Sequence, residues 1–370
     1  MFILTMKNSE LYKFVFQFLI SNESTGFKNN FKEKVIQNEQ VLLKFIRLSS
    51  NHLVLPAIYR RLQKTGLSDD LPTDLTEHLN EILHLNIKRN EEILKQIDEL
   101  NLHLNSAGIE PVYMKGTANL LDDLYIEKAD RLIGDIDFLV RDEDFLPTAE
   151  IVLSLGYKTD IEIYDEINTL KDYPRLFRDD VPADIEIHRL PVIPEYSKWF
   201  TPELIFSEKK QIQGKTNCFV PSDKHKLIQN FIHSQLTNKG HLLRLVTLRD
   251  LYDCYLLLNR VSKNEVLNEI KERKKAEIYF DFSRPLLNGS MDLSALDEKS
   301  KRFVAKHNWY INHPLIHFIY IKVFKIKNII SNRFLKAFVD KSVFKNLYVR
   351  ITKPEWWQKR LFKGLKEYFS

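Results

Sequence analysis

The sequence predicts an α+β fold: a mostly helical chain around a small mixed sheet, with helical parts on its N-terminal and C-terminal sides. Glycine is scarce, with 10 residues in 370, which leaves few positions for the tight turns of an all-β sandwich. Apolar residues recur at spacings of three and four before position 107 and again after position 221. Alternating apolar stretches, typical of strands, are confined to the middle third of the chain.

The chain is long enough, at 370 residues of which 44% are hydrophobic, to bury the cores of two domains. Two cysteines are too few for a disulfide framework and indicate buried thiols in a reducing cytoplasm. Changes in pattern divide the chain into an N-terminal helical region, an α/β core, a helical domain and a basic, aromatic-rich tail. These parts span residues 1–107, 108–220, 221–320 and 321–370.

A long helix is predicted over residues 72–107. Its apolar residues lie three and four positions apart, Thr73 provides a plausible cap, and Gly108 provides the stop. The apolar stripe has a polar gap around Asn86 and Asn90.

The α/β core begins with a short strand at residues 111–114, which ends at the turn 115–117. A helix is expected at 118–124. Residues 135–140 alternate and then become fully apolar, as a buried strand does, and a helix follows over 144–156.

Two further strands are predicted, at residues 157–164 and 183–188. The second one alternates clearly, so Asp184, Glu186 and His188 share one face while the isoleucines between them occupy the other.

The region after position 221 returns to helix, with predicted helices at 222–236 and 242–258. Three histidines spaced eight residues apart lack the closer spacing or the cysteines of a zinc site. They are expected to be surface or capping residues: His225, His233 and His241.

The tail, residues 321–370, carries 13 Lys and Arg against 3 acidic residues, a net charge of +10, which leaves −5 on residues 1–320 of the total +5. Aromatic residues are interleaved with these cations. Three interpretations stay open: a helical layer with buried aromatics and solvated lysines, a groove for RNA, or a surface for anionic lipid. The expected location is the cytoplasm, with peripheral contact to the inner membrane face as an alternative.

Asp135 and Asp137 are the first candidates for chemistry. Two carboxylates separated by one strand residue project from one face, with Cα atoms about 6.6 Å apart. Both can therefore converge on a hard cation such as Mg²⁺, which takes oxygen ligands from protein and from substrate phosphates. A solvated strand end would show the same pattern.

The neighbouring elements supply the other groups that phosphate chemistry needs. At Lys115-Gly116-Thr117 the glycine lets a phosphate approach the backbone, and the lysine can pair with it. Glu186 offers a third carboxylate on a separate strand. An ordinary strand-to-helix turn and an amphipathic edge strand are the plain alternatives.

These elements in this order resemble the polymerase-β-like nucleotidyltransferase superfamily, and more narrowly a family of uncharacterised bacterial nucleotidyltransferases. The similarity covers roughly residues 30–260 and is specific over 111–157. It is carried by Lys115-Gly116, Leu120, Leu124-Tyr125, Arg131, Gly134 to Val140, Gly156-Tyr157, Glu186-Ile187-His188, Arg244-Leu245 and Leu248-Arg249-Asp250. Gly116-Thr117 stands where the superfamily usually has Gly-Ser, and 19 residues separate Gly116 from Asp135.

The resemblance implies a nucleotidyltransferase-type sheet and a site that moves a nucleoside monophosphate from a nucleoside triphosphate to an acceptor hydroxyl of a protein, an RNA or a small molecule. A phosphotransferase, or a non-catalytic nucleotide- or RNA-binding module, are the alternatives on the same fold. Mg²⁺ or Mn²⁺ would be held by the catalytic acids Asp135, Asp137 and Glu186. The nucleotide would bind at Lys115, Gly116, Thr117 and Arg131, with Asp184 and His188 as accessory residues.

Overall fold

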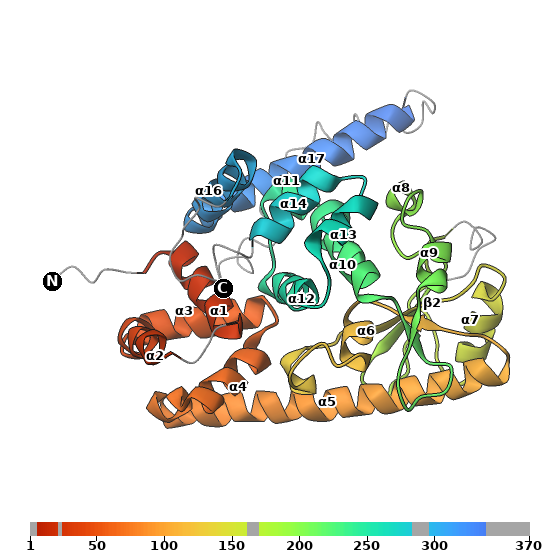
Figure 1. Cartoon of the computed structure of the whole chain (residues 1–370), viewed down its shortest axis with the longest axis horizontal. Coiled ribbons are helices and arrows are strands. Elements are labelled where there is room, and N and C mark those ends of the chain that lie inside the picture. Colours follow the sequence, from red (N-terminus) through yellow and green to blue (C-terminus); the bar gives the residue numbers. More distant parts are fainter. Residues whose placement is uncertain (1–5, 21–23, 161–169, 283–295, 338–370) are drawn as a thin grey trace.

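The computed structural model describes residues 6–20, 24–160, 170–282 and 296–337. Its N-terminal part is a set of helices that ends in α5, a 34-residue helix running along one side of the molecule (Figure 1). These elements are α1 (Asn8–Ile20), α2 (Thr25–Phe31), the π-helical turn η1 (Lys32–Ile36), α3 (Glu39–Asn51), α4 (Leu55–Thr65), the 3₁₀ turn η2 (Leu67–Asp70) and α5 (Thr73–Ser106).

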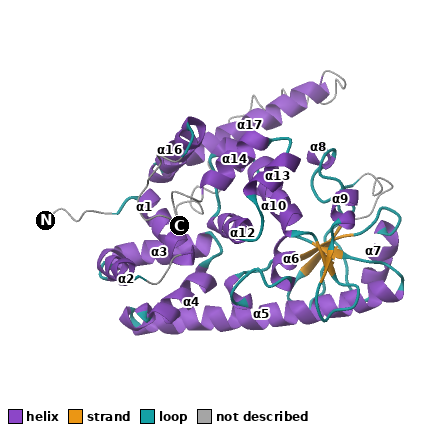
Figure 2. Cartoon of the chain, viewed as in Figure 1, coloured by secondary structure: helices purple, strands orange, loops and turns teal. Residues whose placement is uncertain are grey.

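The strands lie together at one end of the molecule (Figure 2). In the part of the chain that the structure describes they form a five-stranded mixed sheet in the order β3-β2-β1-β5-β4, in which β2 pairs parallel with β3 and antiparallel with β1. The strands are β1 (Val112–Tyr113), β2 (Asp135–Leu139), β3 (Asp184–His188), β4 (Lys210–Gln211) and β5 (Phe219–Val220). The predicted α+β class, mostly helix around a small mixed sheet, is confirmed.

Short helices join the strands, and a second helical part follows them. The connecting elements are α6 (Lys115–Leu121), the 3₁₀ turn η3 (Lys128–Asp130), α7 (Phe145–Ser154), α8 (Pro194–Ser197) and α9 (Pro202–Ser207). The later helices are α10 (Asp223–Phe231), the π-helical turn η5 (Ile232–Thr237), α11 (Gly240–Leu243), α12 (Leu248–Leu258), α13 (Lys263–Glu269), α14 (Arg273–Phe282), α16 (Glu298–Asn312) and α17 (Pro314–Ala337).

Three predicted elements differ from the structure. The helix expected at 118–124 begins three residues earlier, as α6, so residues 115–117 form its first turn. The helix expected over 242–258 is broken, because Arg244 adopts a left-handed backbone with φ 59° and the chain restarts at α12, where the Thr247 side chain caps the helix. Of the strand expected over 157–164, Lys158 forms an isolated bridge with Phe177, and residues 161–164 lie outside the described residues. The tail beyond residue 337 also lies outside them.

The polar gap in α5 is a docking point for the turn that precedes β2. The Asn86 Nδ2 donates to the carbonyl of Ala129 at 2.7 Å. The Asn90 Nδ2 donates to the carbonyls of Lys128 at 2.7 Å and Arg131 at 2.8 Å. Because the bonds to Ala129 and Arg131 are buried, the two asparagines satisfy carbonyls that would otherwise lose their hydrogen bonds to water. The gap therefore positions the start of β2.

The N-terminal and C-terminal helices pack against each other and share one hydrophobic cluster. The Tyr12 hydroxyl of α1 donates to the carbonyl of Val246 at 2.8 Å, and the Ser9 backbone N–H donates to Asn312 Oδ1 at 2.9 Å. Among the described residues, no helix is both long and apolar enough to cross a membrane.

Two histidines whose rings contact Tyr12 of this cluster, the half-buried His52 and the buried His307, predict a loss of stability in mild acid. Burial lowers the pKa of His307 from 6.5 to about 3 and that of His52 to about 4. The unfolded chain therefore binds more protons between pH 6.5 and 4, and the free energy of unfolding falls as the pH falls through this window. At pH 5, His307 alone should account for about 2 kcal/mol.

Urea denaturation at pH 7.5 and pH 5 measures this loss. The variant His307→Gln should show a pH-dependent difference smaller by about 2 kcal/mol. His103→Gln, at an exposed position on α5, should show the same difference as the unmodified chain. An equal pH dependence in both variants would contradict the assignment.

Candidate active site

The register of β2 and β3 determines which acids meet. Asp137 lies opposite Glu186, and Asp135 lies opposite Asp184 in this parallel pair. Since side chains alternate along a strand, all four carboxylates project from one face of the sheet. The opposite face carries the fully buried apolar residues Ile136, Phe138, Ile185 and Ile187. Burial of that face leaves the acids only one orientation.

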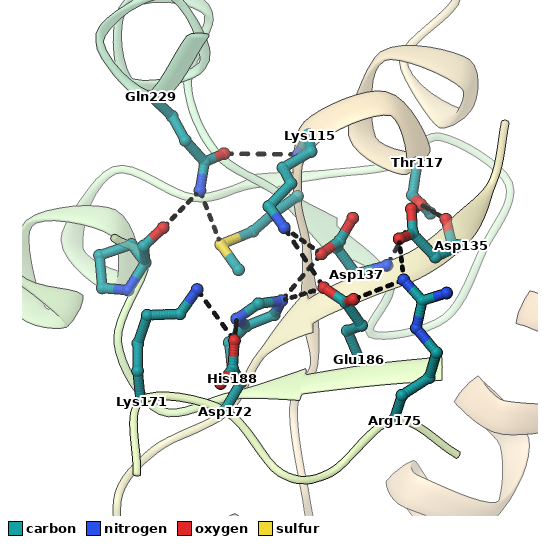
Figure 3. A network of polar contacts seen from close by, with 12 residues as sticks. Lys115, Thr117, Asp135, Asp137, Lys171, Asp172, Arg175, Glu186, His188 and Gln229 are labelled. Carbon is teal, nitrogen blue, oxygen red and sulfur yellow. Dashed lines mark hydrogen bonds and ion pairs between the residues drawn. The ribbon is translucent and has the colours of Figure 1, made fainter. Parts of the chain in front are cut away.

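Asp137 is the most deeply buried of these acids, with 2% of its surface exposed. Lys115 Nζ forms an ion pair with its Oδ1 and lies 3.5 Å from Glu186 Oε2 (Figure 3). His188 Nε2 donates to Asp137 Oδ1 at 2.8 Å and lies 3.6 Å from Glu186 Oε2. Burial alone would raise the pKa of Asp137, but Lys115 and the hydrogen bond from His188 outweigh it and hold that pKa below its ordinary value.

The pKa values of the other two acids of the predicted metal set, Glu186 and Asp135, shift in opposite directions. The hydrogen bond from His188, with Lys115 nearby, lowers the pKa of Glu186 far below its ordinary value. Burial and the neighbouring charges of Asp137 and Glu186 raise the pKa of Asp135. Carboxylates packed this closely repel one another, so the cluster favours a cation.

Lys115 begins the first turn of α6 and has an unusual backbone conformation. Its φ is 53°, in the left-handed region that non-glycine residues rarely adopt. Its N–H donates to Gln229 Oε1 of α10 at 3.3 Å, and the Gln229 Nε2 donates to the carbonyl of Pro191 at 3.0 Å. Strain of this kind persists only where surrounding contacts hold it, and α10 supplies them here.

The next two residues of the turn are closely packed. A Cβ atom on Gly116 would lie 3.2 Å from Ile133 Cδ1 and 3.4 Å from Arg131 Nη2, so a side chain would press on both. The Thr117 side chain is buried, and its hydroxyl donates to the carbonyl of Asp135 at 3.2 Å. The hydroxyl therefore ties α6 to β2.

Arg131 is a buried cation held by α12. Its Nη2 lies 3.2 Å from Asp253 Oδ2, and its Nε donates to the Tyr125 hydroxyl at 3.2 Å. Burial opposes the charge, but Asp253 and Tyr125 outweigh it and raise the pKa of Arg131. This residue links the strand of the paired aspartates to the helical part.

Arg175 is a functional candidate that sequence reasoning missed. Its guanidinium lies 3.1 Å from Asp135 Oδ2, 2.9 Å from Glu186 Oε1 and 3.4 Å from Asp184 Oδ2. The segment that carries it runs antiparallel beside β3 through isolated bridges, a pairing that leaves no periodic pattern in the sequence. No local signal could have identified Arg175.

A cavity of about 260 Å³ opens beside the acids, between the sheet and the helices α6, α10 and α12. Among the predicted site residues, its described lining includes Lys115, Gly116, Arg131, Asp135 and Asp137. The other four are near the acid cluster but not in that lining: Thr117, Asp184, Glu186 and His188.

The helical wall of this cavity was not predicted as part of the site. It contributes Lys226, Gln229, Asn230, His233, Arg249 and Asp250. In the sequence, the Arg249-Asp250 pair of the family-like element could have indicated this helical wall. The expectation of a surface or capping residue is wrong for His225, whose ring is buried, packs edge-on against Phe200 at 5.7 Å and makes no capping hydrogen bond among the described residues.

The acid cluster fits a divalent cation. Asp137, Glu186 and His188 each offer one ligand atom, and these atoms lie within 4.8 Å of one another. The carboxylates suit Mg²⁺ or Mn²⁺, whereas imidazole is a commoner ligand of softer ions. The hydrogen bond from His188 to Asp137 therefore indicates that the histidine orients the carboxylate.

The mixed sheet with its paired acids, and the first turn of α6 beside them, define a protein of the nucleotidyltransferase class. The model of the uncharacterised nucleotidyltransferase family matches residues 39–282, more than half of the chain, and the chain belongs to that family. No curated protein matches it. The matched span includes both the sheet and the helices α10 and α12, so both walls of the cavity lie within the family region.

Arg131 provides a test of how the two walls are joined. Arg131→Met should lower the free energy of unfolding by about 3–5 kcal/mol, because Asp253 would be left buried without its cation. Adding Asp253→Asn should recover part of this loss, since the uncompensated charge is removed. Urea denaturation of the two single variants and the double variant measures it. A loss below about 1 kcal/mol in Arg131→Met would show that the Arg131–Asp253 ion pair does not hold the two walls of the cavity together.

Proposed function

We propose that the protein transfers a nucleoside monophosphate from a nucleoside triphosphate to an acceptor hydroxyl, with Mg²⁺ or Mn²⁺ as cofactor. The observation that carries the proposal is the β2–β3 register, which brings Asp137 and Glu186 together beside Lys115 at the edge of a cavity. Asp135 lies on the same face and lines that cavity.

The cation would be held by Asp135, Asp137 and Glu186. When bound, it would neutralise phosphate charge and polarise the phosphorus–oxygen bonds. Lys115 now balances the charge of Asp137 and Glu186, so its ammonium occupies the place where a cation is favoured. On cation binding, Lys115 would be repelled from the acids and freed to pair with a phosphate.

The cavity supplies cations for the triphosphate. Arg131 and Arg249 line it together with Lys115, and a glycine at position 116 leaves room at the turn. Gly116 would form the wall against which the phosphates lie, and Thr117, which is buried behind it, would hold that wall through its hydrogen bond to the carbonyl of Asp135. Among the described ion pairs, Arg249 contacts only its neighbour Asp250. Its guanidinium would therefore be available to pair with a phosphate.

The acceptor side would be formed by Glu186 and its neighbours. Glu186 would accept the proton of an acceptor hydroxyl. His188, 2.8 Å from Asp137 and 3.6 Å from Glu186, would orient both carboxylates. Asp184, at the outer end of the cluster, would be an accessory group. The acceptor class, contact of the tail with RNA or an anionic membrane, and a cytoplasmic location stay predictions.

Labelled nucleotides separate this function from its alternatives. Cell lysate is incubated with the protein, Mg²⁺ or Mn²⁺, and each nucleoside triphosphate labelled at the α- or the γ-phosphate. Label transferred from the α-position supports nucleotidyl transfer. Label transferred only from the γ-position would indicate a phosphotransferase, and absence of both with intact nucleotide binding would indicate a binding module.

The paired aspartates should make nucleotide binding depend on metal. In the variant Asp135→Asn/Asp137→Asn, affinity for triphosphate in the presence of Mg²⁺ should fall at least about tenfold, the effect of losing about 1.4 kcal/mol of interaction. Affinity without metal should not fall, because two charges that repel the phosphates are gone.

Isothermal titration calorimetry with and without EDTA measures both affinities. The control Asp160→Asn/Asp179→Asn makes the same charge change at exposed positions and should bind like the unmodified chain. Unchanged Mg²⁺-dependent affinity in the folded Asp135/Asp137 variant would rule out the assignment.

Glu186 should act on turnover more than on binding. Glu186→Gln should keep most of the triphosphate affinity and lose at least about 10²-fold in transfer, as removal of a general base does. Asp184→Asn should have a milder effect. Pyrophosphate release and label in the acceptor are the readouts.

The matched control is Glu143→Gln, at an exposed turn after β2. It should transfer at the unmodified rate. Equal losses of affinity and turnover in Glu186→Gln would show that Glu186 only shapes the ground-state site.

A further inference from the structure

A second cavity lies between α1, α3, α16 and the segment that joins α11 to α12. Its volume is about 390 Å³, larger than the 260 Å³ of the cavity beside the aspartates. Helices α1 and α16 pack directly against each other at this place (Figure 1). The apolar part of its wall comes from Leu11, Leu48, Val246, Ile311 and Pro314.

The charged lining of the second cavity has one sign. Lys44, Arg47 and Arg244 line it, whereas no aspartate or glutamate occurs in its described lining. Lys44 and Arg47 are exposed, so they bring positive charge to the place where the cavity meets solvent. Among the described residues, none of these three cations forms an ion pair with a carboxylate. Their positive charges are therefore not neutralised by a carboxylate of the described residues.

Arg244 has an unusual backbone conformation and specific side-chain contacts. Its backbone is left-handed, with φ 59°, where the expected helix breaks. Its guanidinium packs over the Phe303 ring, 4.7 Å from the centroid, and its Nη1 donates to the carbonyl of His241. Burial lowers the pKa of Arg244. The Arg244-Leu245 element belongs to the family-like pattern, yet Arg244 lies in the second cavity and not beside the acids.

Neutral polar groups complete the wall. His307 lines the cavity with 1% of its surface exposed, and its Nδ1 has no hydrogen-bond partner among the described residues. The Leu248 N–H donates to His52 Nδ1, so the proton of the neutral His52 ring is on Nε2. A buried ring nitrogen without a partner costs free energy unless a ligand or a water molecule satisfies it.

We propose that this second cavity binds a small organic anion, with its carboxylate or phosphate head at Arg244, Arg47 and Lys44 and its apolar body against the wall formed by α1, α3 and α16. Cations without a carboxylate partner among the described residues provide the attraction, and the apolar wall selects a ligand with hydrocarbon next to its charge. The two cavities share a short stretch of chain, because Val246 of this cavity lies three positions before Arg249 of the first one.

Matched eight-carbon probes test the proposal by isothermal titration calorimetry on the full chain. Octanoate and octyl phosphate should bind with a stoichiometry of one, and their relative affinity distinguishes a carboxylate from a phosphate ligand. Octanol, which lacks the charge, and inorganic phosphate, which lacks the hydrocarbon, should each bind at least about tenfold more weakly.

Variants locate the binding. Lys44→Gln/Arg47→Gln changes two exposed residues and should weaken octanoate and octyl phosphate at least about tenfold. Arg244→Gln should do the same if its thermal unfolding shows that it is folded. The control Arg302→Gln/Lys306→Gln, on exposed positions of α16 outside the lining, should have no effect.

Three results would overturn the proposal. They are octanol binding as tightly as octanoate, unchanged anion affinity in Lys44→Gln/Arg47→Gln, and failure of both eight-carbon anions to bind. These measurements involve neither metal nor nucleotide, so they stand independently of the proposed transfer activity.

Discussion

The buried charge of Asp137 is the constraint on which the site depends. An ionised carboxylate with 2% exposure costs several kcal/mol unless cations and hydrogen bonds compensate it. Lys115 and His188 supply that compensation from two different elements. Lys115 does so from a left-handed backbone conformation, and its N–H is held by Gln229 of α10. One charge thereby connects two strands, the first turn of α6 and the helical part.

A second set of contacts fixes where β2 begins. Asn86 and Asn90 of α5 hold the turn ahead of the strand by its carbonyls, while Arg131 anchors the same turn to Asp253 of α12. The paired aspartates therefore start from a point held on both sides by buried polar contacts, which are stronger in a low-dielectric interior than at the surface. A cavity between the sheet and the helices follows from this arrangement.

Much of the fold could be predicted from local patterns in the sequence. The long helix after position 72, the strands with Asp135 and Glu186, and a small α/β unit among helices were predicted from spacing and alternation, whereas the mixed sheet was implied by the family resemblance. The break at Arg244 was not, because helical propensity continues through it and only tertiary contacts reverse the backbone there. The polar gap at Asn86 and Asn90 was visible in the sequence, but its partner was not.

The sequence by itself determined which residues share a strand face and that two acids stand one residue apart, because alternation is a local property of the chain. Only the tertiary structure decided that Asp137 meets Glu186, that Arg175 covers the outer acids, and that Arg249 lines the same cavity as Asp135. These contacts join segments far apart in the chain. They depend on strand register and on how helices pack against the sheet, and neither leaves a periodic trace in the sequence.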